Sequence, residues 1–116
     1  MPKSPRRAAG VRRRSASRVS PIEIGAVAGL AAAAPLQAAL LAAIERRLPV
    51  VIDASAVTSL SAACVQVLVS GARALAEAAV PFTVRQPSDA FVDAFSDLGL
   101  FAQLMEWPVE AVGPAE

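Results

Sequence analysis

The chain has 116 residues, of which 55% are apolar, and this length suffices for one domain with one hydrophobic core. It has no histidine and a single cysteine, Cys64, which excludes catalysis by imidazole, the commonest zinc ligand sets, an intrachain disulfide and a CxxC redox pair. The net charge is +1, yet residues 1–20 carry seven Lys and Arg and no acid, whereas the remaining 96 residues carry four Arg and ten acids. The charge divides the chain into a basic arm and an acidic domain.

The arm is rich in Arg, Ser and Pro and has no apolar periodicity, which predicts a disordered basic tail over residues 1–18. A solvated tail, or upstream codons included in the gene, is the favoured interpretation because no aromatic residues lie between the arginines. A nucleic-acid or membrane-surface binder remains the alternative. The apolar stretch that follows, Pro21–Ile44, contains Glu23, Pro35 and many Ala and Gly residues, so we expect no membrane span.

The first elements are a short strand and a helix. Weak alternation predicts a strand over 19–25. In the segment 31–47, Leu36, Leu40 and Ile44 recur every four residues, which predicts an amphipathic helix.

A second strand and helix follow. The β-branched run Val50–Ile52 is typical of a strand that is covered on both faces, and it ends at Asp53. Small residues predict a connection over 53–60. Ser61 is a good N-cap for a helix that runs to about residue 79. Within this helix, Gly71 would permit close packing.

The third strand is predicted at Phe82–Arg85, and Ser88 is expected to cap a third helix. Phe91, Phe95 and Leu98 follow at spacings of four and three residues, so they should form the buried side of this helix.

The chain after this helix is expected to close the domain. Gly99 has the position of a left-handed residue after a helix, and Leu100 can pack back in a Schellman motif. Residues 101–107 are predicted to add a short strand or a tail that covers the core, and 108–116 a flexible tail.

The order of elements predicts an α/β fold over residues 19–107. It should have a small mixed or parallel sheet of about four strands packed with three or more helices.

No motif for catalysis, a cofactor or a metal is present, since the chain lacks Gly-rich phosphate loops, GxSxG and HExxH. We therefore expect a protein that is not an enzyme. Cys64 is interpreted as a buried core thiol rather than a nucleophile. Asp53 is interpreted as a loop cap that accepts N–H groups around Ser55, rather than as a metal ligand or acid–base group.

The most promising candidate for a binding site is the loop between the strand ending at Ile52 and the helix beginning at Ser61. In open α/β sheets, strand carboxyl ends and helix amino ends face one crevice, where unpaired N–H groups and hydroxyls are open to a partner. A phosphate added there would bring about two negative charges and switch an interface.

The stretch Val50–Leu68, VVIDASAVTSLSAACVQVL, resembles the core of a STAS domain, the fold of bacterial anti-sigma factor antagonists. The later Gln86-Pro87-Ser88 and Leu98-Gly99-Leu100 agree with this resemblance. The segment Ala63–Leu68 is similar to a proteobacterial branch often encoded beside chemotaxis genes.

The resemblance implies a cytoplasmic, non-enzymatic switch module in partner-switching or chemotaxis-linked signalling. Its partner would be an anti-sigma-type kinase or ATPase, or a chemotaxis component, with no nucleic acid and no membrane span. The runner-up is a STAS subunit of a lipid-transport ATP-binding-cassette complex.

The chain departs from the family pattern where the partner kinase usually phosphorylates a hydroxyl. Ala62 and Ala63 stand at the two hydroxyl positions, and Ser61 stands where the pattern has Asp. Ser61 or Ser59 would be the substitute phosphoacceptor, although Ser61 is also explained as a plain N-cap. The residues expected to bind the partner are Ser55, Ser59, Ser61, Ala62, Ala63 and Gln66.

Overall fold

The computed structural model describes residues 21–110, and the predicted tail over 1–18 lies outside them. Its main sheet has four parallel strands in the order β1-β3-β5-β6, formed by Ile22–Glu23, Val50–Asp53, Phe82–Arg85 and Val109–Glu110. A second sheet is a parallel pair of two-residue strands, β2 (Val27–Ala28) and β4 (Ser59–Leu60). The α/β class and the parallel four-strand sheet are confirmed.

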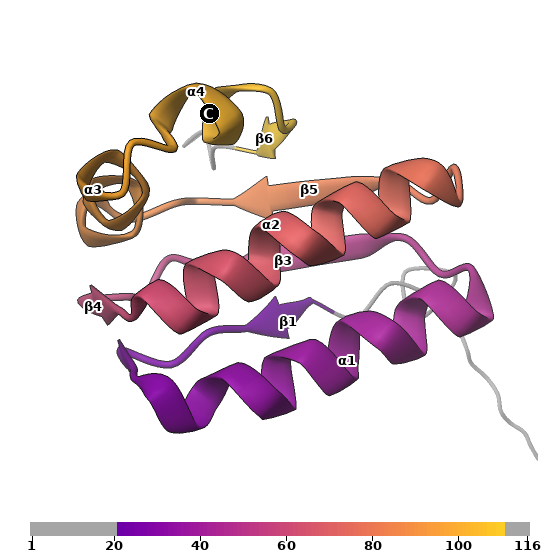
Figure 1. The fold of residues 1–116 in the computed structure, drawn as a ribbon, viewed down its shortest axis with the longest axis horizontal. Helices are drawn as coiled ribbons and strands as arrows, with labels where there is room; N and C mark the ends of the chain where they lie inside the picture. The colour runs from indigo at the N-terminus through magenta and orange to yellow at the C-terminus, as the bar shows by residue number, and fades with distance from the viewer. Residues whose placement is uncertain (1–20, 111–116) are drawn as a thin grey trace, which may run out of the picture.

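Four helical elements follow the 3-10 turn η2 at Leu30–Ala32. They are α1 (Ala33–Arg46), α2 (Ala62–Glu77), α3 (Asp89–Asp97) and α4 (Phe101–Met105). Figure 1 shows α1 and α2 side by side along the strands, with α3 and α4 together at one corner. None of the helices between residues 21 and 110 has the length and apolarity needed to cross a membrane.

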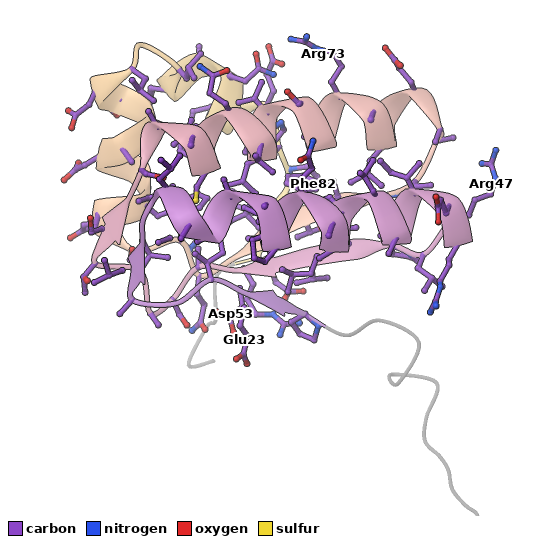
Figure 2. All side chains as sticks on the ribbon, turned by 60° about the horizontal axis from the view of Figure 1, so that its bottom comes forward. Glu23, Arg47, Asp53, Arg73 and Phe82 are labelled. Atoms are coloured by element: carbon purple, nitrogen blue, oxygen red, sulfur yellow. The ribbon has the colours of Figure 1, made fainter. Side chains whose placement is uncertain are left out.

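The core lies between the sheet and the helices. Its largest fully buried side chains are Phe91, Phe95, Leu40, Ile52, Leu68, Leu75, Val65, Val84 and Cys64. In β3, Val50 and Ile52 are buried but Val51 and Asp53 are only half-buried. Glu23 and Asp53 point away from the helices (Figure 2). The prediction that β3 is covered on both faces is therefore wrong for the described residues, whose helices pack on one face of the sheet.

Close packing of α1 on α2 depends on Gly71, as predicted. A Cβ atom at this position would lie 2.6 Å from Cδ1 of Leu40, whose side chain is buried. At the other end of the pair, Arg47 ends α1 in the left-handed conformation and donates from Nη1 to the carbonyl of Ala78, 2.9 Å away. The two helices are thus in contact at the middle and at the carboxyl end of α2.

The end of α3 forms the predicted Schellman motif. Gly99 has a φ of +74°, and the N–H groups of Gly99 and Leu100 donate to the carbonyls of Ser96 and Phe95 at 3.0 and 2.8 Å. Leu98 was expected in the buried stripe but is exposed. It occupies the C-cap, where the helical spacing ends, and Leu100 packs on the core in its place.

The segment after Gly99 differs from the prediction. Residues 101–105 form the helix α4, which buries Leu104, and no strand forms in 101–107. Trp107 covers the core by packing edge-on against Phe82 and Phe95, with ring centroids 5.0 and 5.4 Å apart. Strand β6 lies within the predicted flexible tail 108–116, of which 111–116 lie outside the described residues.

Candidate functional site

The start of α2 is fixed by the small sheet β2–β4. The N–H of Ser61 donates to the carbonyl of Ala28 at 2.8 Å, and the N–H of Ser59 donates to the carbonyl of Ala26 at 3.0 Å. These bonds fasten the residues before α2 to the chain that follows β1. The turn η2 also packs against α2. The amino end of α2 is consequently held by two segments that lie about thirty residues earlier in the chain.

Ser61 is the N-cap of α2, as predicted. Its backbone is extended (φ −74°, ψ 157°), and its Oγ accepts a hydrogen bond from the N–H of Cys64 at 3.3 Å. The side chain is half-buried. Its Oγ therefore satisfies one of the free N–H groups at the start of α2.

Cys64 is a buried core thiol, as predicted. Its side chain is fully buried, and Sγ lies 3.5 Å from the carbonyl oxygen of Gly29 and 3.7 Å from that of Ala28. A thiol is a weak donor, so these contacts satisfy it between β2 and η2. Cys64 thus connects the first turn of α2 to the segment beneath it and presents no reactive atom to solvent.

Asp53 caps the loop after β3. Its Oδ1 accepts from the Oγ of Ser55 at 2.7 Å and from the N–H of Ser55 at 3.0 Å, which confirms the predicted role. These two hydrogen bonds, with a smaller contribution from the positive charge of Arg85, lower the pKa of Asp53 below its ordinary value. The carboxylate stays ionised in its structural role. Within residues 21–110, no three His, Cys, Asp or Glu side chains come close enough to hold a metal ion.

None of the residues expected to bind a partner is buried. Ser59, Ala62 and Gln66 are exposed, and Ser61 and Ala63 are half-buried. Because Gln66 lies three and four residues after Ala63 and Ala62, these side chains share one face of α2. The structure brings these five residues together along β4 and the first turns of α2.

Ser55 is exposed but lies away from the other expected partner-binding residues. It lines a shallow hollow of about 320 Å³ together with Asp53, Ala56 and the segment 23–25 of the first strand and its loop. No residue of α2 lines this hollow. Ser55 is therefore set apart from the other five expected residues.

Two apolar residues join the surface that sequence reasoning did not include. Val27 is 75% exposed and pairs in register with Ser59, and Leu30 is 77% exposed in η2. In the sequence, the one sign that they are special is that they are the only large apolar side chains between Gly25 and Ala34. Their place beside α2 follows from the pairing of β2 with β4, which is too short to show a period. We call the α2 surface the set Val27, Leu30, Ser59, Ser61, Ala62, Ala63 and Gln66.

The α2 surface is uncharged, since it contains no Asp, Glu, Lys or Arg. It combines two exposed apolar side chains, two small alanines and the polar groups of Ser59 and Gln66. Large exposed apolar side chains are typical of a contact with another protein.

Comparison with known families gives a match to a family model. The family model described as "Mlab, STAS domain" matches residues 11–106, which covers most of the chain and every residue of the α2 surface. The match begins within the predicted tail over 1–18 and ends one residue before the predicted domain end at 107. A search of curated proteins gives no significant match.

Proposed function

Because the chain belongs to the STAS domain family, we propose that it is a regulatory protein-interaction module whose partner docks on the α2 surface. The observation that carries this proposal is the exposure of two large apolar side chains: Val27, which pairs in register with Ser59, and Leu30 in η2, which packs against α2. The partner would cover these apolar side chains, and burial of each would contribute about 1.5–3 kcal/mol to the contact before ordering costs.

The proposed binding is constitutive rather than switched by phosphate. Ala62 and Ala63 carry no hydroxyl, and the Oγ of Ser61 accepts the capping bond from Cys64. Among the two substitute acceptors, Ser59 is the exposed one. A phosphate would add about two negative charges to a surface that has no cation to balance them, and this would weaken docking. The unphosphorylated chain is therefore the form that we propose binds the partner.

The partner that we propose is an anti-sigma-type kinase or ATPase, or a component of chemotaxis-linked signalling. The support is the similarity of Ala63–Leu68 to the chemotaxis-associated branch and the exposure of Gln66 on the α2 surface. The partner face should be uncharged and should offer an apolar recess for Val27 and Leu30.

A second candidate is the STAS subunit of a lipid-transport ATP-binding-cassette complex. The observation that favours it is the pair Ala62 and Ala63, because a permanent subunit needs no phosphoacceptor at its interface. The two candidates use the same surface and differ in the partner. A nucleotide-binding transporter subunit that co-purifies in constant ratio would support the second candidate, and a soluble kinase or signalling protein the first.

The test is affinity capture from the native cell with the full chain, followed by mass spectrometry. Ala62→Arg places a long charged side chain on the α2 surface, and Ala42→Arg places the same side chain on an exposed position of α1. We expect one ATPase, kinase or signalling protein to be recovered with the unchanged chain and with Ala42→Arg but not with Ala62→Arg. Equal recovery with Ala62→Arg would refute docking on the α2 surface.

A further inference from the structure

The segment that contains α3 and α4 carries negative charge only. Residues 86–110 include five Asp and Glu and no Lys or Arg. Asp89, Asp93 and Asp97 recur every four residues on α3 and are all exposed, whereas Phe91 and Phe95 point into the core. Within residues 21–110 the ion pair is between Arg85 and Glu110, so the three α3 carboxylates have no cationic partner there.

An apolar strip continues the acidic stripe onto α4. Phe101 is 47% and Met105 61% exposed, and at a spacing of four residues they lie on one face of α4. Leu98, directly after Asp97, is exposed as well. Because α3 and α4 pack against each other at the corner of the molecule away from α1 (Figure 1), these exposed groups lie on adjoining elements. We call this set the α3–α4 face: Asp89, Asp93, Asp97, Leu98, Phe101 and Met105.

This combination of groups suits arginine side chains. A guanidinium group binds a carboxylate with two parallel hydrogen bonds, and it also stacks on an aromatic ring such as that of Phe101. Carboxylates one helical turn apart, bordered by an exposed ring and a thioether, therefore fit a peptide with several arginines better than one with lysines.

The chain itself contains such a peptide. Residues 1–20 carry six Arg and one Lys and no acid, which gives +7. Residues 21–110 carry four Arg and nine acids, which gives 4 − 9 = −5. The two parts are complementary in charge, and the excess of acid over base is concentrated in 86–110.

We propose that the α3–α4 face binds the arginine-rich segment 3–18 of the same chain. Its sixteen residues can extend to roughly 53–58 Å, while α2, the longest helix, spans about 24 Å, so the segment is long enough to reach this corner from its attachment at β1. The covalent link gives an effective concentration of the order of millimolar. Contacts that would be weak between separate molecules are then populated.

While they are in contact, segment 3–18 and the α3–α4 face would each be less accessible to other charged partners. An anionic partner of the arginines has to compete with Asp93 and Asp97, and a cationic partner of α3 has to compete with the arginines. The proposal is independent of docking on the α2 surface, which lies on other elements.

A spin label tests the contact in the full chain. Gly10→Cys provides the attachment point, and the unchanged chain is the labelling control because its one thiol, Cys64, is fully buried. We expect the label to broaden the amide signals of Asp93, Asp97, Phe101 and Met105 at low salt and to leave those of Glu45 and Glu77 sharp. At about 1 M salt, where the screening length is about 3 Å, the broadening should be lost. Uniform broadening, or broadening that survives high salt or scales with protein concentration, would overturn the proposal.

Two variants of equal net charge give the second measurement. Asp93→Asn/Asp97→Asn and Glu45→Gln/Glu77→Gln each remove two exposed carboxylates and raise the net charge from +1 to +3. If α3 holds the arginines, the first variant releases them and elutes from a heparin column at higher salt than the second. It also loses the selective broadening, whereas the second keeps it. Equal elution with unchanged broadening in both variants contradicts the proposal, and dispersed amide spectra establish that each variant is folded.

Discussion

The contact between Gly71 and Leu40 predicts that Gly71→Ala destabilises the protein when residue 40 is Leu and stabilises it when residue 40 is Ala. In Gly71→Ala, the new Cβ would stand 2.6 Å from Cδ1 of Leu40, about 1 Å inside the ordinary carbon–carbon distance of roughly 3.5–4.0 Å. Overpacking of this kind costs about 1–3 kcal/mol. Alanine gains about 1 kcal/mol over glycine in a helix interior. The net change in unfolding free energy should be a loss of about 0–2 kcal/mol.

In the background Leu40→Ala the same substitution should stabilise the protein. The Cδ1 and Cγ atoms that crowd the new Cβ are gone, and the remaining Cβ–Cβ distance of 3.6 Å is an ordinary contact. Only the helix propensity then acts, so Gly71→Ala should gain about 1 kcal/mol. Leu40→Ala alone costs about 2–5 kcal/mol, which a typical domain stability of about 5–15 kcal/mol tolerates.

The assay is urea unfolding of the four proteins of this double-mutant cycle. The fluorescence of the single tryptophan, Trp107, reports the transition because its ring packs on Phe82 and Phe95. The expected coupling energy is about 1–3 kcal/mol, with equal slopes against urea in all four proteins. A gain of the same size from Gly71→Ala in both backgrounds would refute the close approach of α1 and α2.

Three further substitutions test the caps and the loop. Ser61→Ala should lower the unfolding free energy by about 1 kcal/mol through loss of one cap, and Ser88→Ala by about 2 kcal/mol. The larger loss has a structural cause, because the Oγ of Ser88 also donates to the carbonyl of Val57 at 2.6 Å; equal losses in urea titrations would argue against that bond. Since the pKa of Asp53 is lower in the folded protein, its contribution to stability is present above the ordinary carboxyl range and is lost as the pH falls through the folded value. Asp53→Asn should therefore flatten the decline of stability below about pH 4; an unchanged acid limb would contradict the role of Ser55 as its donor.

The caps and helices were accessible to sequence reasoning because they depend on neighbours within four residues. Ser61 and Ser88 each act on an N–H three residues later, and Gly99 has no side chain to resist a positive φ. The parallel sheet followed from the alternation of strands and helices.

The features that could not be predicted from the sequence depend on contacts between residues far apart in the chain. The pairing of β2 with β4 joins residues about thirty positions apart in strands of two residues, and no period exists in so short a strand. Val51 has the same β-branched character as its buried neighbours, so the sequence could not indicate that its side of β3 is only half-covered. Hence Ala62 and Gln66 could be proposed for the docking surface from the sequence, whereas Val27 and Leu30 could be proposed only from the structure.

The central claim is that a partner covers the α2 surface, and hydrogen exchange of the full chain with and without the captured partner tests it most directly. We expect slower exchange in the segments 27–30 and 59–66 on binding, with no change at α3 and α4, and the same footprint after incubation with ATP. Protection confined to α3 and α4 or to the strands, with 59–66 exchanging as in the free protein, would contradict the claim.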